Sequence, residues 1–302
     1  MQDGFGREIK GIRISVTQRC NLNCFYCHKE GQNPSKNEMT PSEIERIVVI
    51  GKKIGIKQLK ITGGEPLARK DICEIVQRAS NHMKNVSMTT NGILLEKYAA
   101  DLKSAGLRRV NISFDTLDSE KYKIITGTDC LSQVVDGLNA AISNDLTPIK
   151  LNMVIMKGIN EDEIEEMIRF ASEKKVILQL IELEMFNKEF YEKYHHDIGP
   201  LVAQLEERSV RIKERDLHHR HKYFIKIDDN IGEVEVVKPM HNTTFCSNCT
   251  RIRVTADGKL KPCLLRSNNL VDVIGLIRKN ASDEELIETF KKAILLREPF
   301  WR

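Results

Sequence analysis

Six of the eight cysteines in this 302-residue sequence fall into two groups of three. Cys20, Cys24 and Cys27 have the spacing C-x3-C-x2-C, short enough for one loop to bring three thiols to a single metal site. Three thiols are one ligand short of a tetrahedral zinc site or of a fully ligated [4Fe-4S] cubane. The spacing therefore predicts either an iron-sulfur cluster with one open iron or a zinc knuckle completed by His28.

The second group has the spacing C-x2-C-x13-C and consists of Cys246, Cys249 and Cys263. Arg251 and Arg253 follow at alternate positions of an expected strand, so they point the same way. Guanidinium groups suit phosphates or the carbonyl oxygens of a base. The group predicts a second cluster with an open iron; the alternative is a zinc ribbon completed by His241.

The sequence Gly63-Gly64-Glu65-Pro66 lies between an expected strand and an expected helix. Paired glycines allow the backbone to approach a ligand closely. The Glu65 carboxylate could accept hydrogen bonds from an ammonium group. On its own this pattern is also that of an ordinary turn.

The elements that must position these groups alternate between strands and helices. Strands are expected to begin at residues 12, 58, 86, 109, 149 and 176, with helical patterns between them. This alternation predicts parallel β/α units. Polar residues gather where the strands end, which is where β/α barrels build their sites. Because six units are two short of a full barrel, we predict an α/β fold with a partial (β/α)6 TIM-like barrel.

From about residue 184 the pattern changes. We therefore divide the chain into a barrel domain, residues 1–184, and a cluster-binding extension, residues 185–302, that caps the barrel. The extension is expected to hold hairpins over 222–238 and around 256–258, and helices near 270–279 and 283–296. The segment His218-His219-Arg220-His221 lies in a charged region that we interpret as a solvated surface loop.

The composition is that of a soluble enzyme, with 41% hydrophobic and 30% charged residues. No apolar run approaches the roughly 20 residues needed to span a membrane, and the first residues lack the order of a secretory signal. We expect a cytoplasmic protein without membrane contact. A net charge of +4 is too small to predict stable nucleic-acid binding, but it does not repel a small anion.

The first cysteine group and the Gly-Gly-Glu-Pro turn together resemble the radical S-adenosylmethionine enzymes, over about residues 10–183. The resemblance implies a [4Fe-4S] cluster on Cys20, Cys24 and Cys27, whose open iron binds the amino and carboxylate groups of S-adenosyl-L-methionine. It implies that Tyr26 lies against the adenine. One electron then releases a 5′-deoxyadenosyl radical.

With the second group, and with Phe5-Gly6-Arg7 and the residues before Cys20, nearly the whole chain resembles the GTP 3′,8-cyclase family of molybdenum cofactor (molybdopterin) biosynthesis. This implies a second [4Fe-4S] cluster, on Cys246, Cys249 and Cys263, that binds the purine of GTP. The implied cofactor contacts are Tyr26, Gly64 and Ser113. The implied GTP contacts are Arg13, Lys60, Thr89, Lys150, Arg251, Ile252 and Arg253.

The resemblance implies a lyase in which the radical removes the ribose 3′-hydrogen and the ribose carbon attacks C8. The product is (8S)-3′,8-cyclo-7,8-dihydroguanosine 5′-triphosphate. An electron donor is required and is not identified by the sequence, and a homodimer is left open. The alternatives are a radical peptide maturase with an auxiliary cluster and, more remotely, a zinc-dependent nucleic-acid-binding module.

Three positions depart from the family pattern. Lys60 replaces the usual arginine, so a bidentate fork becomes a point charge. The family's methionine after the sixth strand has no secure counterpart near Met185. The sequence ends at Arg302 without the Gly-Gly tail that is typical of the family.

Overall fold

The computed structural model describes residues 1–185, 187–215 and 217–300. Within them one sheet has the strand order β12-β11-β10-β1-β2-β3-β4-β5-β6-β9-β8-β7. The six expected strands are β1 (Gly11–Ser15), β2 (Gln58–Thr62), β3 (Val86–Thr90), β4 (Arg109–Ser113), β5 (Lys150–Ile155) and β6 (Ile177–Glu182). They pair in sequence order and all neighbours are parallel. The predicted β/α alternation is confirmed.

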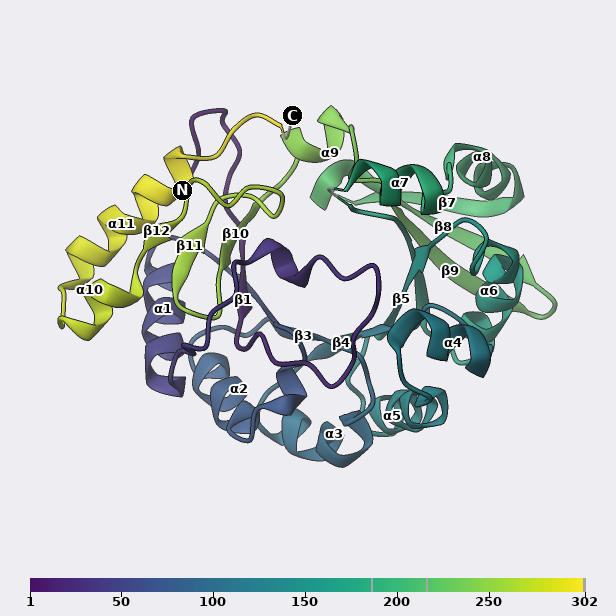
Figure 1. Ribbon diagram of the computed structural model, residues 1–302, viewed down its shortest axis with the longest axis horizontal. Helices are drawn as coiled ribbons and strands as arrows, with labels where there is room; N and C mark the ends of the chain where they lie inside the picture. Colours follow the sequence, from purple (N-terminus) through teal and green to yellow (C-terminus); the bar gives the residue numbers. More distant parts are fainter. Residues whose placement is uncertain (186, 216, 301–302) are drawn as a thin grey trace.

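The helices that follow these strands cover the outer, convex side of the curved sheet (Figure 1). They are α1 (Pro41–Lys53), α2 (Ile72–Ser80), α3 (Leu95–Ser104), α4 (Ser119–Thr126), α5 (Leu131–Ser143) and α6 (Ile164–Glu173). Thr40 caps α1 in a reciprocal capping box with Glu43. The segment between β1 and α1, which contains the first cysteine group, crosses the opening of the curved sheet (Figure 1).

The inner strands are apolar at alternate positions, and this alternation decides which side chains face the concave side. Ile12 and Ile14 of β1 are fully buried, whereas Arg13 between them is only partly buried. Because successive side chains of a strand point to opposite faces, Arg13 faces away from the apolar layer under the helices. Its register neighbours on β2 and β10 are Lys60 and Arg253, so the sheet itself places three basic side chains in one row.

The C-terminal part of the chain lengthens this sheet at both edges. Its strands are β7 (Ser209–Arg215), β8 (Arg220–Ile227), β9 (Asn230–Val237), β10 (Arg251–Val254), β11 (Lys259–Lys261) and β12 (Val271–Asp272). Strand β9 is parallel to β6, and β10 is parallel to β1. Residues from both sides of the predicted boundary at 184 therefore share one sheet. It ends at β7 and β12, which do not pair, so the predicted partial barrel is confirmed.

The remaining helices are α7 (Lys188–Tyr194), α8 (Gly199–Arg208), α9 (Thr243–Ser247), α10 (Ile274–Arg278) and α11 (Asp283–Leu295). The hairpins expected over 222–238 and around 256–258 are present as β8–β9 and β10–β11. Strand β7 lies in the charged region before residues 218–221, and the last two residues of that supposed loop, Arg220 and His221, begin β8. Strand β7 gave no burial signal because its apolar residues Val210 and Ile212 are exposed. Helices α4, α7, α8 and α9 were not predicted.

In the described ranges, no helix has both the length and the apolar character that crossing a bilayer requires.

Candidate functional site

The two glycines of the Gly-Gly-Glu-Pro turn support the base of the first cysteine loop. A Cβ atom on Gly64 would lie 2.3 Å from the carbonyl oxygen of Arg19, so only glycine fits there. The amide of Gly64 donates to the carbonyl of Thr17 (2.8 Å), and that of Glu65 donates to the carbonyl of Arg19 (2.7 Å). The turn thus fixes the backbone that leads into Cys20.

Glu65 has a different environment from the one expected. Its buried carboxylate accepts hydrogen bonds from the Thr90 hydroxyl and the Asn91 amide, each at 2.7 Å. It also accepts one from the Leu67 amide at 3.0 Å. Burial raises its pKa above the ordinary value. The carboxylate therefore ties the end of β3 to the glycine turn.

The other limb of the cysteine loop is fixed by α4 and β4. The amides of Asn23 and Phe25 donate to the carbonyl oxygens of Thr126 and Ile125, at the end of α4. The Tyr26 hydroxyl donates to Asp115, which follows β4, at 2.6 Å. The loop is therefore held from both sides, although its cysteines are half-buried or exposed.

The donor set of this loop fits an iron-sulfur cluster. Backbone amides donate to two of its sulfurs, from Leu22 to Cys20 and from Lys29 to Cys27, each at 3.4 Å. Hydrogen bonds to the sulfurs are among the means by which proteins tune such clusters. Burial, followed by the charges of Asp115 and the two other thiols, raises the pKa of Cys24 to about 12. The thiols are thus close enough to destabilise one another's charged forms.

No three Cys, His, Asp or Glu side chains of the described residues share a site for one metal ion. A cubane does not require this, because its thiolates bind different irons. His28, the fourth ligand of the zinc alternative, has its Nε2 3.8 Å from Glu184. His241, which would complete the zinc ribbon, is exposed.

The second cysteine group is held by two arginines from distant parts of the chain. Arg7 donates to the carbonyl oxygen of Cys246 (2.9 Å), and Arg297 donates to that of Cys249 (2.7 Å). Both guanidinium groups are joined by the buried carboxylate of Asp3, at 2.6 and 2.8 Å. This network gives the N-terminal sequence around Arg7 a structural role in the second group.

The environment of the second group is basic. Burial alone would raise the pKa of the Cys249 thiol, but Arg297 and Arg253 outweigh this effect and hold it below its ordinary value. The three cysteines of this group all border a cavity of about 400 Å³ on the concave side of the sheet. Three sulfur ligands with positive charge around them fit a cluster that meets an anionic molecule.

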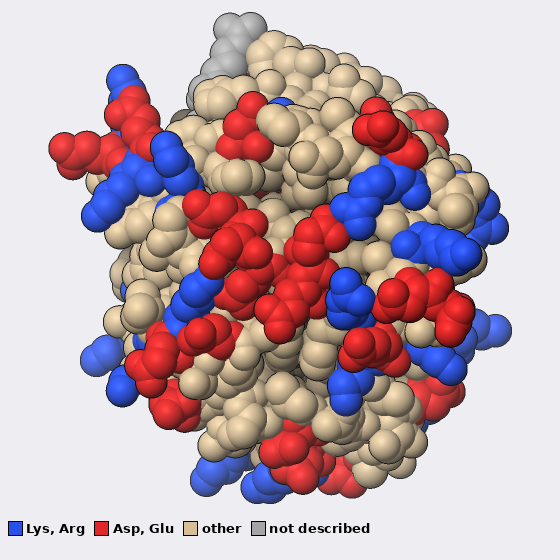
Figure 2. Space-filling model, turned by 90° about the vertical axis from the view of Figure 1, so that its right-hand side faces the viewer, with Lys and Arg blue, Asp and Glu red and all other residues tan. Residues whose placement is uncertain are grey.

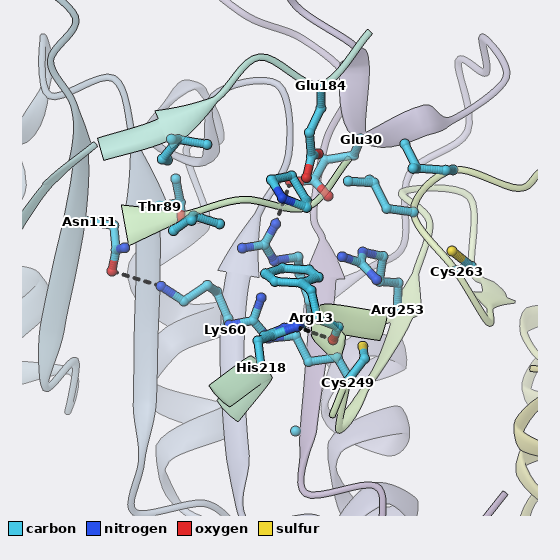
Figure 3. A pocket seen from close by; sticks show the side chains of 18 of the residues that line it. Arg13, Glu30, Lys60, Thr89, Asn111, Glu184, His218, Cys249, Arg253 and Cys263 are labelled. Carbon is cyan, nitrogen blue, oxygen red and sulfur yellow. Dashed lines mark hydrogen bonds and ion pairs between the residues drawn. The ribbon is translucent and has the colours of Figure 1, made fainter. Parts of the chain in front are cut away.

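The same cavity brings together most of the predicted site residues (Figure 3). Its lining includes Arg13, Tyr26, Lys60, Thr89, Ser113, Lys150, Arg251 and Arg253. Gly64 and Ile252 do not line it: Gly64 packs against the cysteine loop, and the Ile252 side chain is fully buried in the core. Cys20, Cys24 and Cys27 are not part of its lining either, although Tyr26 and His28 beside them are.

The two cysteine groups lie beyond opposite ends of β1. Cys20 follows the carboxyl end of this strand. Cys249 precedes β10, whose first residue, Arg251, is in register with Gly11 at the start of β1. In Figure 3, Glu30 and Glu184 lie toward one end of the view and His218 and Cys249 toward the other, with Arg13 between them. The cavity therefore extends along the strands between the two groups.

The lining of the cavity is strongly basic. It contains nine arginines and two lysines but four glutamates. Burial and the neighbouring cations Arg13 and Arg253 lower the pKa of Arg251 to about 9, and burial with Arg13 lowers that of Lys60 well below its ordinary value. Carboxylates, by contrast, gather in the middle of the outer face drawn in Figure 2. The positive charge is concentrated inside, where it favours a polyanion.

Some of these cations already have protein partners. Arg13 forms an ion pair with Glu30 (3.2 Å), and Lys60 donates to Asn111 (2.8 Å). Lys150 lies 2.5 Å from Glu235, but burial and Arg215 still lower its pKa to about 7. The side chains of Arg251 and Arg253 have no hydrogen-bond or ion-pair partner within the described residues. These two guanidinium groups are the ones most available to a ligand.

Buried polar atoms that lack partners also gather at the cavity. Eight side-chain atoms in the described part of the chain are buried without a hydrogen bond. Five of them belong to residues that line this cavity: Arg13 Nε, His28 Nδ1, Thr89 Oγ1, His218 Nε2 and Arg253 Nε. Because buried polar groups normally have partners, the concentration indicates that a polar ligand completes the site.

Sequence reasoning missed several lining residues. Arg109, Asn111, Arg215 and Arg220 all face the cavity. A signal for the first two was present, since Arg109 and Asn111 alternate with the apolar residues Val110 and Ile112 on the strand that ends at the predicted site residue Ser113. Arg215 ends β7 and Arg220 begins β8, and these strands are connected to β6 only through β9, so local sequence gives no signal for either residue.

The interpretation of residues 218–221 as a solvated loop is wrong for His218. This residue belongs to the 3-10 turn η4 (Leu217–His219) and is only 7% exposed. Its ring stacks on Phe245 with 3.7 Å between ring centroids. Burial, followed by Arg251 and Arg220, lowers its pKa to about 2, so the ring is neutral. His219 is exposed, as expected.

Comparisons with known proteins match both parts of the chain. Residues 14–171 match the radical SAM superfamily, and residues 176–302 match the family described as Molybdenum Cofactor Synthesis C. A "Probable GTP 3′,8-cyclase" of Pyrococcus horikoshii is 54% identical over 99% of this chain and 97% of its own length. The protein of the same name from Pyrococcus abyssi is 53% identical, over 99% of each chain.

A solved structure shares the fold. The Streptococcus suis protein SuiB, bound to S-adenosylmethionine, matches with a TM-score of 0.60 and 17% sequence identity. The match covers 85% of this chain and 58% of the longer SuiB chain. At this identity the likeness concerns the arrangement of strands and helices.

Proposed function

Since the chain belongs to the radical SAM superfamily and to the family of the probable GTP 3′,8-cyclases, we propose that it is itself a GTP 3′,8-cyclase of molybdenum cofactor biosynthesis. The observation that carries the proposal is the basic cavity next to the second cysteine group. Both Arg251 and Arg253 line this cavity, and among the described residues their side chains have no hydrogen-bond or ion-pair partner. They suit the triphosphate and the carbonyl of a guanine nucleotide.

Each of the two cysteine groups would hold one [4Fe-4S] cluster. Cys20, Cys24 and Cys27 would hold the [4Fe-4S] cluster that binds S-adenosyl-L-methionine, with Tyr26, Gly64 and Ser113 as further contacts. The remaining three cysteines would hold a second [4Fe-4S] cluster beside GTP. When bound, the first cluster and its cofactor supply the 5′-deoxyadenosyl radical that removes the ribose 3′-hydrogen.

The chain's own residues orient the nucleotide and exclude water. Arg13, Lys60, Lys150, Arg251 and Arg253 bring positive charge from strands β1, β2, β5 and β10, so a triphosphate is held from several sides. Thr89 adds a buried hydroxyl that has no hydrogen-bond partner in the described part of the chain. Fixing the ribose and the base together favours the intramolecular attack on C8 over competing reactions of the ribose radical.

The peptide-maturase alternative shares the fold, and its discriminating feature is the charge of the cavity. Nine arginines and two lysines around one cavity suit a compact polyanion better than a peptide backbone. The zinc-dependent alternative predicts about two zinc ions per chain, whereas two cubanes predict about eight irons. The cytoplasmic location, the electron donor, the absence of stable nucleic-acid binding and a homodimer stay predictions.

The test is anaerobic incubation of the reconstituted protein with S-adenosylmethionine, a reductant and GTP. We expect 5′-deoxyadenosine and a cyclised nucleotide to form in about equal amounts. Deoxyadenosine without any cyclised nucleotide would contradict the assigned substrate. Zinc in place of iron after anaerobic purification would contradict the reaction class.

A further inference from the structure

Glu235, on β9, is a charged residue behind the wall of the cavity. Its side chain is fully buried, and it is not among the residues that line the cavity. Val234 and Val236 on either side of it pack in the apolar core, so the alternation of the strand turns Glu235 toward the concave side. Its register neighbours are Gln179 of β6 and Lys222 of β8. A carboxylate buried at this place requires cationic or hydrogen-bonding partners.

The three residues that donate to this carboxylate all line the cavity. One carboxylate oxygen accepts from Lys150 Nζ at 2.5 Å and from Gln179 Nε2 at 3.0 Å. The other oxygen accepts from the guanidinium group of Arg215, at the end of β7. Glu235 therefore joins a lysine of β5 to an arginine of β7, although these two strands are not neighbours in the sheet.

The carboxylate uses only part of the hydrogen-bonding capacity of the two cations. A lysine ammonium group has three donors and a guanidinium group has five. Lys150 and Arg215 each give one of them to Glu235. Both side chains can thus present further N-H groups to a ligand in the cavity. Since Glu235 does not reach the cavity itself, its effect on a ligand must pass through these two side chains.

The cations around Glu235 outnumber the carboxylates. Besides the two bonded cations, Arg220 and Lys222 of β8 act on it. Lys222 Nζ lies 3.8 Å from Glu235 and 2.5 Å from Glu233, the other carboxylate of this group. Burial alone would raise the pKa of Glu235, but the two bonded cations outweigh this effect and lower it to about 2. Four cations with two carboxylates leave an excess of positive charge, which a bound polyanion can balance.

We propose that Glu235 is a positioning residue that holds Lys150 and Arg215 in place for the triphosphate of the substrate. The proposal rests on GTP as the substrate proposed above, and it adds Arg215 to the phosphate contacts. Strands β5, β7 and β9 lie across the opening from β1 and β10 (Figure 1). The two cations therefore meet the phosphates from the side opposite Arg251 and Arg253. Fixing two flexible side chains before the ligand arrives reduces the entropy that binding costs.

The charge of Lys150 gives a second way to observe Glu235. The other charged side chains that line the cavity around this lysine are cations from four strands: Lys60 of β2, Arg109 of β4, Arg215 of β7 and Arg220 of β8. Nearby cations disfavour a charged ammonium group, whereas the Glu235 carboxylate favours it. Without this carboxylate, Lys150 should lose its positive charge at a lower pH.

The test compares Glu235→Gln with the wild-type holoenzyme under anaerobic conditions. Glutamine has nearly the same shape, but its NH2 group cannot accept a hydrogen bond from either cation. The probes are inorganic tripolyphosphate, GTP and S-adenosylmethionine, and their affinities are measured between pH 6 and pH 8. Glu233→Gln is the matched control, because Glu233 belongs to the same strand and its ion-pair partner Lys222 does not line the cavity.

We expect Glu235→Gln to weaken the binding of tripolyphosphate and of GTP by similar factors, roughly tenfold at pH 7, as for one charged hydrogen bond. The fall of GTP affinity with rising pH should be centred roughly one pH unit lower than in the wild type. The affinity for S-adenosylmethionine should not change. Glu233→Gln should alter neither the affinities nor the pH profile.

Two outcomes would overturn the role of Glu235 directly. If it acted only through its negative charge, its removal would make the cavity more positive, and tripolyphosphate would bind more tightly. Tighter or unchanged binding therefore contradicts the proposal, and so does a pH profile that stays in place. Equal losses for tripolyphosphate and S-adenosylmethionine, with a lower melting temperature, also overturn it, because they would indicate a disturbed fold.

The same measurements separate this proposal from the proposed function. If the wild-type protein binds GTP no better than tripolyphosphate, the assigned substrate fails, while the role of Glu235 can still be measured with tripolyphosphate. If the wild-type protein binds both and Glu235→Gln behaves like it, only the role of Glu235 fails. If neither probe binds to the wild-type protein, both proposals are wrong.

Discussion

The two cysteine groups have the same number of thiols but opposite electrostatic surroundings. Near the first group, burial raises the pKa of Cys20 and Cys24, and the carboxylates Glu65 and Asp115 add to this effect. Near the second, Arg297 and Arg253 hold the pKa of Cys249 low. S-adenosylmethionine carries a sulfonium and an ammonium group, whereas GTP is a polyanion. If each group holds a cluster as proposed, its charged surroundings, more than its three thiols, would select the ligand of the open iron.

The chain segments that follow the two cysteine groups are nevertheless connected by hydrogen bonds and packing. Lys261, which is 1% exposed, donates to the carbonyl of Gly31 (2.8 Å) after the first group, and to the carbonyl of Arg266 and the hydroxyl of Ser267 (3.2 Å) after the second. A Cβ atom on Gly31 would lie 2.3 Å from the carbonyl oxygen of Leu264. The backbones that leave the two groups are therefore in direct contact.

The largest effects should come from removing one thiol from each of the two cysteine groups. Cys24→Ala should abolish deoxyadenosine formation, because it removes a ligand of the radical-forming cluster. Cys249→Ala should retain deoxyadenosine formation but give no cyclised nucleotide. Each variant should lose about four of about eight irons, measured by iron and sulfide analysis. Loss of deoxyadenosine in Cys249→Ala with the first cluster intact would show that the two sites are not separable.

The double variant Arg251→Ala/Arg253→Ala should weaken GTP binding by about a hundredfold or more, since each charged hydrogen bond contributes about 1.5–3 kcal/mol. Binding of S-adenosylmethionine should not change, because the arginines act at the opposite end. Equilibrium binding of both ligands checks this. Lys259→Ala, a half-buried hairpin position outside the cavity lining, serves as the control. Equal losses for both ligands would contradict the division of charge between the two ends.

A smaller effect concerns pH. Burial lowers the pKa of Lys150 to about 7, so its positive charge is present below pH 7 and is lost as the pH rises above it. GTP affinity should therefore fall by roughly five- to tenfold between pH 6.5 and 8. Lys150→Arg keeps its charge at both values. At each pH, the GTP affinity of the wild-type protein is divided by that of Lys150→Arg, which cancels the titration of GTP itself. A ratio that stays constant between pH 6.5 and 8 would argue against Lys150 as the titrating group.

The smallest expected effect is that of Lys261→Met. The substitution leaves two carbonyl oxygens and a hydroxyl without their buried donor. This loss should lower the free energy of local opening by about 1–3 kcal/mol. Hydrogen exchange of the amides in residues 29–32 and 264–267 should accelerate by about tenfold. Lys259→Met on the same hairpin should leave it unchanged. Unaltered exchange in both segments would show that Lys261 does not join the two groups.

The parts of the site that could be predicted from the sequence depend on short spacings. The first cysteine group, the glycine turn and the pair Arg251 and Arg253 are each contained within a few residues, and the second cysteine group lies within 18 residues. The β/α alternation follows from local apolar patterns. A resemblance to known enzymes then supplied Lys150 and Thr89. The structure places both at the cavity.

His218 could not be found in this way. Its burial depends on contacts between η4 and the segment 245–248, roughly 30 residues later in the chain. The neighbouring residues are charged and show no apolar periodicity. In such a segment the local sequence does not distinguish a buried histidine from an exposed one. The same limit applies to the arginine network of the second group, because Arg7 and Arg297 are brought together only by the complete fold.

The pairing of β1 with β10 has a consequence for the order in which the molecule is made. Gly11 and Arg251 are in register although 240 residues separate them. At about 5–20 residues per second, the ribosome needs roughly 10–50 seconds to deliver the partner of the first strand. During that time one edge of β1 is exposed, as on any edge strand. A nascent chain can thus complete its first cysteine loop early, whereas the second site must wait until synthesis is nearly finished.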